Sequence, residues 1–427
     1  MAIFEFFYRL GISLYLLGVY LASFKNPKAA QWLEGRKGQW MAIHKRLNPR
    51  KKKLWVHCAS LGEFEQGRTL IDRLKETYPD TEMVVTFFSP SGYLMRNNYQ
   101  NADHVFYLPM DGKDNARRFI RYVNPRMAVF IKYEFWHFYY KTLNEHNIPL
   151  IQVSTTFRES QALFKWYGKP LLNSLKYVDH FFIQDSTSAD LLDDYGFYNH
   201  TLISDTRFDR VNQMARRSLK LPFLERFTRG TPALICGSSY SREERIVEEL
   251  LDSSWNDKVI IAPHLVNEER ITEIKNRFAG RYCVYSRIPD DKGWEDKQVM
   301  IIDKIGMLGS LYRYGCVAFI GGGFYDHLHN TLEPAAFGLP VVVGPYYHKF
   351  REVSRLIKKG GAFSIQSRGD FEKLLQNELA TVEDRKERGE RAKKFVKDNT
   401  GGTERVLKHI RQLLPSKKPG KVASSAQ

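Results

Sequence analysis

From residue 54 onward the chain repeats one pattern, in which a short, almost wholly apolar run is followed by a longer segment with helical periodicity. Continuous apolar runs of this length are typical of parallel strands that are covered by helices on both faces. The pattern therefore predicts an α/β fold with doubly wound parallel sheets. The predicted strands are residues 54–59, 83–88, 105–108, 127–131, 150–153, 180–183 and 201–203 in the first half, and 233–236, 259–262, 282–285, 299–302, 317–320 and 341–343 in the second.

A polar segment, interrupted by Pro222 and Gly230, separates the two halves of this pattern. We expect a first domain over residues 26–210, a linker over 211–231, a second domain over 232–414 and a disordered tail over 415–427. A chain of 427 residues is long enough for two such domains with sizeable cores. Ligands of doubly wound sheets bind beyond the carboxyl ends of the strands, so a site is expected in a cleft between the domains.

Residues 1–25 carry a membrane signal. Residues 6–24 are apolar apart from Arg9 and a few small or hydroxyl side chains, and as a helix they would reach roughly 28 Å, close to the thickness of a bilayer core. Lys25 and Lys28 follow directly, so the positive-inside rule places the rest of the chain in the cytoplasm. We expect a single N-terminal membrane anchor, which either spans the bilayer or lies deep in its interface. A buried helix of a soluble protein is the alternative, and the lack of a basic n-region and of a clear A-x-A site argues against a cleaved secretory signal.

The chain is basic, with 65 Lys and Arg against 48 Asp and Glu, and much of the excess lies at or before Lys53. Trp32 and Trp40 stand among these cations, which suits the headgroup layer of an anionic membrane. No RNA-recognition aromatic pattern supports the alternative of RNA binding, so we expect anionic lipids and no nucleic acid as partners. The 43% hydrophobic content argues against a disordered chain, and four scattered cysteines argue against a zinc module or a disulfide framework.

The first candidate site follows the predicted strand at 54–59. The segment from Ser60 to Glu63 opens a helix, and Gly62 allows a ligand to approach the backbone. Glu63 is therefore a candidate general base, with the alternative that its carboxylate only complements the helix dipole. His57 and Glu65 are nearby alternatives to Glu63, although His57 lies inside the strand, where a structural role is expected.

Two further turns in the first half carry candidate residues. Ser91 and Gly92 follow the strand at 83–88 in a turn that could hold an anion or could be an ordinary helix cap. Glu134 follows the strand at 127–131 between aromatic residues. A carboxylate in such a place needs a partner or a role, which is either sugar binding or an ion pair with Lys132 or Arg158.

The second half carries two segments that suit a nucleotide. The turn Gly237–Ser239 follows a strand and opens a helix, which makes a phosphate site without the lysine of a P-loop. The triplet Gly321–Gly323 follows another strand, where the backbone must approach something closely. Asn330 is placed to cap the next helix and Glu333 lies in its first turn, where a carboxylate could accept both hydroxyls of a ribose.

Taken together, five segments make the sequence resemble a known family: WVHCASLGE, TFFSPSG, KYEFW, GSSYSREE and GGGFYDHLHNTLEPAAFGLPVVVGP. In order and spacing they are similar to those of the Kdo transferases, the 3-deoxy-D-manno-octulosonic acid transferases of lipopolysaccharide biosynthesis. The likeness extends from about Leu10 to about Gly361. The last segment is similar to GT-B glycosyltransferases in general, whereas the SxGE segment beside an N-terminal anchor is more specific to this family.

The resemblance implies a GT-B fold and the inverting transfer of Kdo from CMP-Kdo to a lipid A precursor of the lipid IVA type, at the cytoplasmic face of the inner membrane. By the matching motifs, Glu63 is the expected catalytic base. The expected acceptor-binding residues are Ser60, Gly62, Ser91, Gly92 and Glu134. The expected donor-binding residues are Gly237, Ser238, Ser239, His264, Arg270, Gly322, Gly323, Asn330, Thr331 and Glu333.

The sequence departs from the family pattern in two places. Lys132 stands where the family's E-x-E-x-W-like segment has its first acid. Many members have Pro-Arg-His after the second strand of the second domain, where this chain has Pro263, His264 and Leu265, and Arg270 is expected to substitute for the missing arginine. No D-x-D pair follows a strand, so neither a metal ion nor another cofactor is expected.

Two other functions fit parts of this pattern. The same architecture serves UDP-GlcNAc-using transferases and epimerases of envelope biosynthesis, which a choice of donor substrate would separate. A basic membrane tether with a degenerate sugar-nucleotide fold is the non-enzymatic alternative, and it predicts that Glu63 and Glu333 are dispensable.

Overall fold

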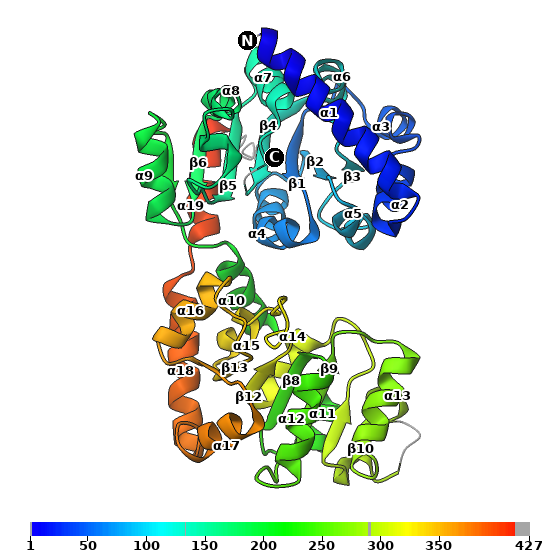
Figure 1. Cartoon of the computed structure of the whole chain (residues 1–427), viewed down its shortest axis with the longest axis vertical. Coiled ribbons are helices and arrows are strands. Elements are labelled where there is room, and N and C mark those ends of the chain that lie inside the picture. The colour runs from blue at the N-terminus through cyan, green and yellow to red at the C-terminus, as the bar shows by residue number, and fades with distance from the viewer. Residues whose placement is uncertain (1, 133, 289–291, 415–427) are drawn as a thin grey trace, which may run out of the picture. The chain divides into compact units, whose positions relative to one another are not determined.

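The computed structural model describes residues 2–132, 134–288 and 292–414, and these residues form two compact units. The first unit comprises Met1–Asp209 together with the end of the chain from Gly401, and the second comprises Arg210–Thr400. Each unit is built on one parallel sheet with helices on its faces, as the apolar runs predict (Figure 1).

The sheet of the first unit has seven parallel strands in the order β3-β2-β1-β4-β5-β6-β7. Chain order reverses between β1 and β4, which is the topological switch point where ligands of doubly wound sheets bind. The strand bounds are β1 (Lys53–Cys58), β2 (Glu82–Phe87), β3 (His104–Tyr107), β4 (Pro125–Ile131), β5 (Leu150–Thr155), β6 (His180–Ile183) and β7 (His200–Leu202).

Successive side chains of the central strand β1 enter two separate cores, one on each face of the sheet. Trp55 packs with Phe119 and Phe130 on one face, whereas Val56 packs with Phe64 on the other. The helices that cover the two faces and line the first unit include α4 (Leu61–Thr77), α5 (Pro90–Arg96), α6 (Lys113–Val123), α7 (His137–Glu145), α9 (Ser186–Asp194) and α19 (Gly402–Leu413).

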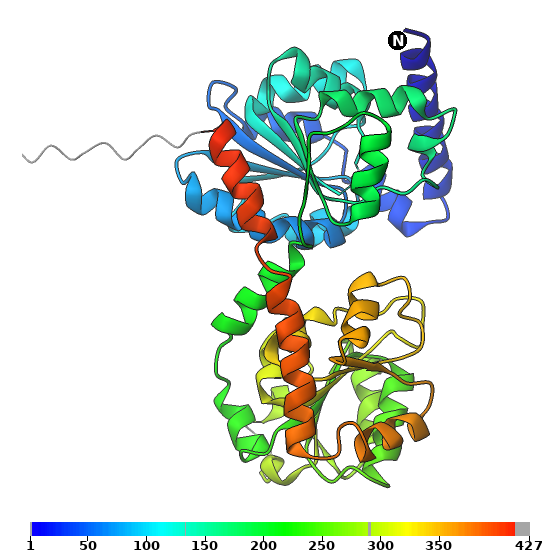
Figure 2. The same ribbon diagram turned by 90° about the vertical axis from the view of Figure 1, so that its left-hand side faces the viewer.

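Helix α19 corrects the predicted domain boundary at residue 414. Val406, Leu407 and Ile410 of this helix belong to the core of the first unit, and Tyr78 donates a hydrogen bond to the carbonyl of Leu414 (2.7 Å). Figure 2 shows α19, in red, lying against the sheet of the first unit. The chain therefore returns to its first domain at its end, and the predicted tail at 415–427 lies outside the described residues.

The second unit has a sheet of seven parallel strands in the order β10-β11-β9-β8-β12-β13-β14, with its switch point between β8 and β12. The last strand is absent from the sequence prediction because its three residues make too short an apolar run. The strand bounds are β8 (Ala233–Ser239), β9 (Val259–Pro263), β10 (Tyr282–Val284), β11 (Val299–Ile301), β12 (Gly315–Ile320), β13 (Val341–Val343) and β14 (Ala362–Ser364).

The segment predicted as a linker, residues 211–231, belongs to the second unit, and most of it is helical. Helix α10 (Arg207–Arg217) covers its beginning, and α11 (Pro222–Thr228) starts at the very proline that was expected to interrupt it. Proline suits the first position of a helix, where its missing N–H has no partner to lose. Leu224 and Phe227 of α11 are fully buried. The other main helices of the second unit are α12 (Ser241–Leu251), α13 (Glu268–Arg277), α15 (Leu332–Phe337), α16 (Arg351–Lys358), α17 (Arg368–Gln376) and α18 (Val382–Asp398).

The N-terminal residues form three helices, α1 (Ala2–Ser23), α2 (Pro27–Glu34) and α3 (Gln39–Arg46), before the first strand. Within α1, the stretch Ile3–Ser23 is long and apolar enough to cross a membrane, which by itself is weak evidence for an anchor. Figure 1 shows α1, in dark blue, running along the first unit beside α2, and the two helices are in contact.

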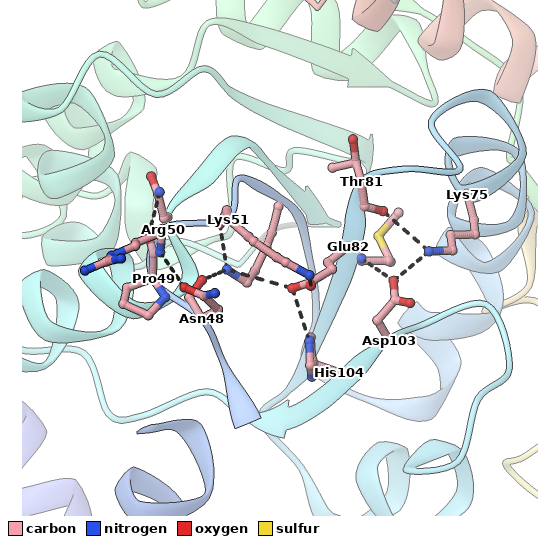
Figure 3. A network of polar contacts seen from close by, with 12 residues as sticks. Asn48, Pro49, Arg50, Lys51, Lys75, Thr81, Glu82, Asp103 and His104 are labelled. Carbon is pink, nitrogen blue, oxygen red and sulfur yellow. Dashed lines mark hydrogen bonds and ion pairs between the residues drawn. The ribbon is translucent and has the colours of Figure 1, made fainter. Parts of the chain in front are cut away.

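Some of the cations expected at a membrane surface are engaged inside the protein. Lys53 is fully buried, and its ammonium donates to the carbonyls of Asn48 (2.6 Å) and Lys51 (2.7 Å). Lys51 pairs with Glu82 in a network at the amino ends of the strands, on the edge of the sheet away from the candidate site (Figure 3). The guanidinium of Arg36 lies 3.6 Å above the ring of Trp32 and donates to the carbonyl of Phe88. The basic surface is therefore smaller than the sequence suggests.

Candidate active site

The switch point of the first sheet brings Glu63 and Glu134 together. Glu63 follows β1 and Glu134 follows β4, and these two strands are paired side by side with His57 opposite Phe130. Parallel strands end at the same edge of a sheet, so residues distant in sequence meet there. Burial is the main reason why the pKa of Glu134 is raised, and the charge of Glu63 adds to the shift, as expected for carboxyl groups that follow neighbouring strands.

Glu63 is held by the first turn of α4. One of its carboxylate oxygens accepts hydrogen bonds from the backbone N–H groups of Ala59 and Ser60, and Ser60 in turn caps the N–H of Glu63 (3.4 Å). This is a capping box, which fixes the direction of the carboxylate. The side chain is 9% exposed, and burial raises its pKa above the usual value while the two N–H groups and Lys132 oppose that shift.

Glu134 lies beside aromatic residues, as its sequence context predicts. The indole of Trp136 donates to its carboxylate (3.0 Å), and the imidazole of His57 lies 3.9 Å away. Burial and the neighbouring charge of Glu63 raise the pKa of Glu134 to about 8. At neutral pH Glu134 is therefore mostly a neutral acid.

His57 is a neutral imidazole in this arrangement, not a rival base. It is fully buried, its Nδ1 bonds the hydroxyl of Thr86 (2.9 Å), and burial lowers its pKa to about 3. Its Nε2 faces Glu134 and makes no hydrogen bond among the described residues. Glu65, the other alternative, lies in α4, and its carboxylate is paired with Arg96 of α5 (2.8 Å).

Of the remaining acceptor-side candidates, Gly62 and Ser91 are accessible to a ligand, whereas Gly92 is explained by packing. An added Cβ at Gly62 would meet only the hydroxyl of Ser60, at 3.9 Å, so the space above this turn is open to a ligand. Packing explains the glycine at position 92, because a Cβ there would lie 2.2 Å from the ring of Phe87. The hydroxyl of Ser91 bonds that of Ser89 (2.8 Å) at an exposed helix start, which leaves it accessible.

The switch point of the second sheet joins the two glycine-containing turns. The N–H of Gly321 donates to the carbonyl of Gly237 (2.9 Å), and a Cβ at Gly321 would lie only 2.0 Å from the carbonyl oxygen of Ser238. Gly322 has φ of +86°, and a Cβ at Gly323 would lie 2.4 Å from the amide nitrogen of Gly344. The close approach that the glycine triplet predicts is therefore an approach to neighbouring backbone.

Glu243, which the sequence analysis did not select, ties these turns together. Its buried carboxylate accepts hydrogen bonds from the N–H of Gly322 (2.9 Å) and from that of Tyr240 (3.2 Å). Glu243 lies at the third position of α12 in a capping box with Tyr240. The sequence signal for this role is the pair Glu243 and Glu244 after the Gly237–Ser239 turn. Only the pairing of β8 with β12 shows that Glu243 reaches the loop of Gly322.

Ser239 and Arg270 are engaged in the protein instead of facing a ligand. The hydroxyl of Ser239 donates to Glu244 (2.7 Å), and the guanidinium of Arg270 pairs with the buried carboxylate of Glu244 and with Glu273. This arrangement does not support the predicted role of Arg270 as a substitute for the missing donor-side arginine. Ser238 has φ of +51° and is half-buried, so it is the serine of this turn that remains available.

Three histidines gather around Tyr240, next to the Gly237–Ser239 turn. The ring of His264 lies 4.4 Å from that of His329, and both pack against Tyr240, whose hydroxyl bonds Nε2 of His329 (3.1 Å). His327 packs against the other edge of Tyr240 (5.1 Å). Burial and the neighbouring imidazoles lower the pKa of His329 to about 4, so this ring is neutral at neutral pH.

Asn330 and Glu333 form the predicted pair at the start of α15. The amide of Asn330 donates to Glu333 (3.1 Å), and its oxygen accepts from the N–H of Leu332 (3.0 Å). Burial raises the pKa of Glu333, and the nearby charge of Arg210 opposes the shift. Thr331 is buried, so its side chain supports the turn. Among the residues that the structure describes, no group of three or more His, Cys, Asp or Glu side chains could hold a metal ion.

Comparisons with known proteins show what the chain is similar to in sequence. A profile of the family described as 3-deoxy-D-manno-octulosonic-acid transferase (kdotransferase) matches residues 35–210. The 3-deoxy-D-manno-octulosonic acid transferase of Haemophilus influenzae is 25% identical over 410 residues, which cover 92% of this chain and 94% of that protein. The enzyme of the same description from Aquifex aeolicus is 26% identical over 346 residues, covering 78% of this chain and 85% of the other.

Solved structures share the fold at low sequence identity. A UDP-GlcNAc 2-epimerase from Neisseria meningitidis has a TM-score of 0.58 at 12% identity, covering 84% of this chain and all of that one. A glycosyltransferase from Rickettsia africae has a TM-score of 0.54 at 11% identity, covering 86% and 100%. Two doubly wound units and these structural neighbours give the chain a GT-B fold. In sequence, the chain is similar over most of its length to the 3-deoxy-D-manno-octulosonic acid transferases named above.

Proposed function

We propose that this protein transfers Kdo from CMP-Kdo to a lipid A precursor of the lipid IVA type, with inversion at the anomeric carbon. The observation that carries the proposal is the buried pair of Glu63 and Glu134 at the switch point of the first sheet, in a chain that is similar to 3-deoxy-D-manno-octulosonic acid transferases. The resemblance of the SxGE segment supports Glu63 as the base.

The two carboxyl groups suit different steps of one reaction. In this proposal Glu63 is the carboxylate of the pair, and its direction is fixed by the N–H groups of Ala59 and Ser60. It takes the proton from the attacking hydroxyl of the acceptor as that oxygen bonds to the anomeric carbon of Kdo. Glu134 is protonated, so it donates a hydrogen bond to a sugar oxygen without adding a second negative charge beside the base.

The second unit supplies the groups that suit the nucleotide. Asn330 and Glu333 are proposed to hold the ribose hydroxyls, and Gly237, Ser238, Gly322 and Gly323 surround the turn proposed to face the phosphate. The departing phosphate gains negative charge, which backbone N–H groups and the N–H groups of neutral imidazoles stabilise. His264 and His329 are the proposed partners in place of the missing arginine.

Attachment to the cytoplasmic face of the inner membrane is proposed from the apolar stretch of α1 and the cations around it. Lys25 and Lys28 are exposed after the helix, where anionic lipids would attract them. A lipid A precursor is itself anchored in a membrane, so an enzyme held at the surface meets its acceptor there.

The direct test is an assay of the purified full chain with CMP-Kdo and lipid IVA, with the products identified by mass spectrometry. A product heavier than lipid IVA by one or more Kdo residues is expected, and UDP-GlcNAc in place of CMP-Kdo should give none. EDTA should leave the rate unchanged, because the proposed reaction uses no metal. Conversion of UDP-GlcNAc, or failure of CMP-Kdo in the presence of an intact fold, would overturn the proposal.

A further inference from the structure

Lys132 has an unusual backbone conformation at the carboxyl end of β4. Its φ is +64°, in the left-handed region that residues with a Cβ seldom adopt, and the neighbouring Ser154 of β5 has φ of +60°. Two contacts with β5 hold Lys132 in place. Its N–H donates to the carbonyl of Val153 (2.8 Å), and its own carbonyl accepts from the hydroxyl of Thr155 (3.0 Å). Backbone strain of this kind concentrates at functional sites, which directs attention to the side chain of Lys132.

Helix α4 packs directly on this end of β4. A Cβ at Gly67 of α4 would lie 2.9 Å from the side chain of Ile131, the residue before Lys132. Gly67 lies about one turn beyond Glu63 in the same helix, so α4 carries the proposed base to the strand end at which Lys132 lies. Two well-packed elements therefore hold the base and the lysine at the same edge of the first sheet.

A second carboxylate, that of Asp205, is fixed beside the same face of α4. Gln66, three residues after Glu63, donates from its side-chain amide to Asp205 (3.3 Å), and its carbonyl accepts from the hydroxyl of Thr206. Asp205 also accepts hydrogen bonds from the backbone N–H (2.9 Å), Nε (3.0 Å) and a terminal nitrogen (2.8 Å) of Arg207. Positions three apart lie on one face of a helix, so Glu63 and Asp205 border the same side of α4.

The positive charge of Lys132 acts on both of these carboxyl groups. Burial raises the pKa of Glu63, and the N–H of Ala59 and the charge of Lys132 oppose that rise. At Asp205 burial is overcome: the paired Arg207 and the charge of Lys132 hold the pKa of this carboxyl group below its usual value. The lysine therefore favours the ionised form of each of them.

Glu134, the partner of Glu63, is affected by other groups. Burial and then the charge of Glu63 raise its pKa, and the hydrogen bond from Trp136 opposes the rise. A cation that favours the ionised form of one member of a coupled carboxyl pair decides which of the two loses its proton first. The charge of Lys132 has this unequal effect on the pair.

We propose that Lys132 is a positioning residue for the reaction: its ammonium group holds the negative charge of the carboxyl pair on Glu63, so that Glu63 is the base and Glu134 remains the acid. This role rests on the proposed function and deepens it, because it names the group that assigns the two carboxyl groups their parts. Asp205, fixed by Gln66 and Arg207, in turn attracts the ammonium group to this end of α4.

The other titratable and charged groups around the start of α4, in the part of the chain that the structure describes, are neutral near pH 7 or engaged with a neighbour: His57, Cys58, Glu65 with Arg96, Asp205 with Arg207, and Arg36 with the ring of Trp32. Burial lowers the pKa of His57 to about 3 and raises that of the Cys58 thiol well above its usual value. A pH profile that changes when Lys132 is replaced therefore reports on the carboxyl pair.

The role is tested by kcat/KM with CMP-Kdo and lipid IVA from about pH 5 to about pH 9. Lys132→Met keeps a long stem without the charge, so Glu63 should lose its proton at a higher pH. The acidic limb should move up by about one pH unit, which makes this variant about tenfold slower on the acidic side. Lys132→Arg, which keeps the charge, should leave the limb in place. So should Lys75→Met, which removes a half-buried lysine paired with Asp103 at the far end of α4.

A lysine with a merely structural role would lower the rate without changing its pH dependence. An acidic limb that stays in place in Lys132→Met, with or without a uniform loss of rate, would therefore overturn the inference. If the methionine variant does not fold, Lys132→Gln takes its place with the same expectation.

A measurement without substrate tests the same contact. Near pH 7 the loss of the urea midpoint caused by Lys132→Met should be smaller in a Glu63→Gln chain than in wild type, because the lysine has then already lost one of its anions. Lys75→Met should cost the same in both backgrounds. Equal losses for Lys132→Met would overturn the inference.

The two measurements separate this role from the proposed activity. A wild-type chain that does not use CMP-Kdo but shows unequal losses refutes the proposed activity and leaves the link between Lys132 and Glu63 standing. A wild-type chain that transfers Kdo but shows equal losses and an unmoved acidic limb refutes the role of Lys132 alone.

Discussion

Replacing Glu134 by glutamine should make the protein more stable above about pH 5 while preserving the reaction near neutral pH. Burial and the charge of Glu63 raise the pKa of Glu134 from 4.5 to about 8. The folded state therefore binds one more proton than the unfolded state between these two pH values. The stability that this carboxyl group contributes is complete below pH 4.5 and is lost as the pH rises through 8.

The magnitude follows from proton linkage. One extra bound proton changes the free energy of unfolding by at most about 1.4 kcal/mol per pH unit, so wild type should lose up to about 2.7 kcal/mol relative to Glu134→Gln between about pH 5.5 and about pH 7.5. Urea unfolding followed by tryptophan fluorescence measures this difference at each pH. Glu159→Gln, at an exposed position, is the matched control and should follow wild type. Parallel curves for wild type and Glu134→Gln would refute the raised pKa.

The activity of the same variant tests the role of the protonated carboxyl group. Glutamine resembles neutral glutamic acid, so turnover with CMP-Kdo and lipid IVA near pH 7 should stay within about threefold of wild type. Above about pH 8 the wild-type rate should fall as Glu134 ionises, whereas the rate of Glu134→Gln should not. A loss of about a hundredfold or more near pH 7 would refute the reasoning, because it would mean that Glu134 acts as a carboxylate.

Three further variants test the rest of the site. Glu63→Gln should lower turnover by about 10²–10⁴-fold with unchanged CMP affinity and melting, and retention of more than about a tenth of the activity would leave the base unassigned. Glu333→Ala should weaken CMP binding by about 1.5–3 kcal/mol in calorimetry, and equal affinities would contradict the ribose assignment. Gly321→Ala should cost about 1–3 kcal/mol of stability in urea unfolding, since its Cβ would lie 2.0 Å from the carbonyl oxygen of Ser238, and an unchanged midpoint would contradict that close packing.

The strands and the candidate loops could be predicted because both depend on local sequence. An apolar run such as that of β1 has one way to be buried on both faces, and the residue after a parallel strand lies at the ligand-binding edge whatever the order of the strands. Glu63 and Asn330 were found in this way, and the short β14 was missed because its run is too brief to carry a signal. Helix α11 was missed because Pro222 was interpreted as an interruption instead of a helix start.

The chemistry of the site depended on which strands lie side by side, and only the tertiary structure decides that. The pairing of β1 with β4 brings Glu134 close to Glu63. The charge of Glu63 then adds to the effect of burial and raises the pKa of Glu134. The pairing of β8 with β12 likewise lets Glu243 hold the N–H of Gly322. A carboxylate's neighbours set its pKa, and neighbours from distant parts of a chain are not visible in its local sequence.

The same reason explains the N-terminal helix and the end of the chain. Sequence alone determined that residues 6–24 form an apolar helix, because that property follows from composition. Which surface each helix covers was decided by the fold: Tyr8 finds the buried carboxylate of Asp111, and Val406 enters the core of the first unit instead of the second. Packing selects among surfaces of equal hydrophobicity through shape and a few polar partners, and these exist only once the sheets are assembled.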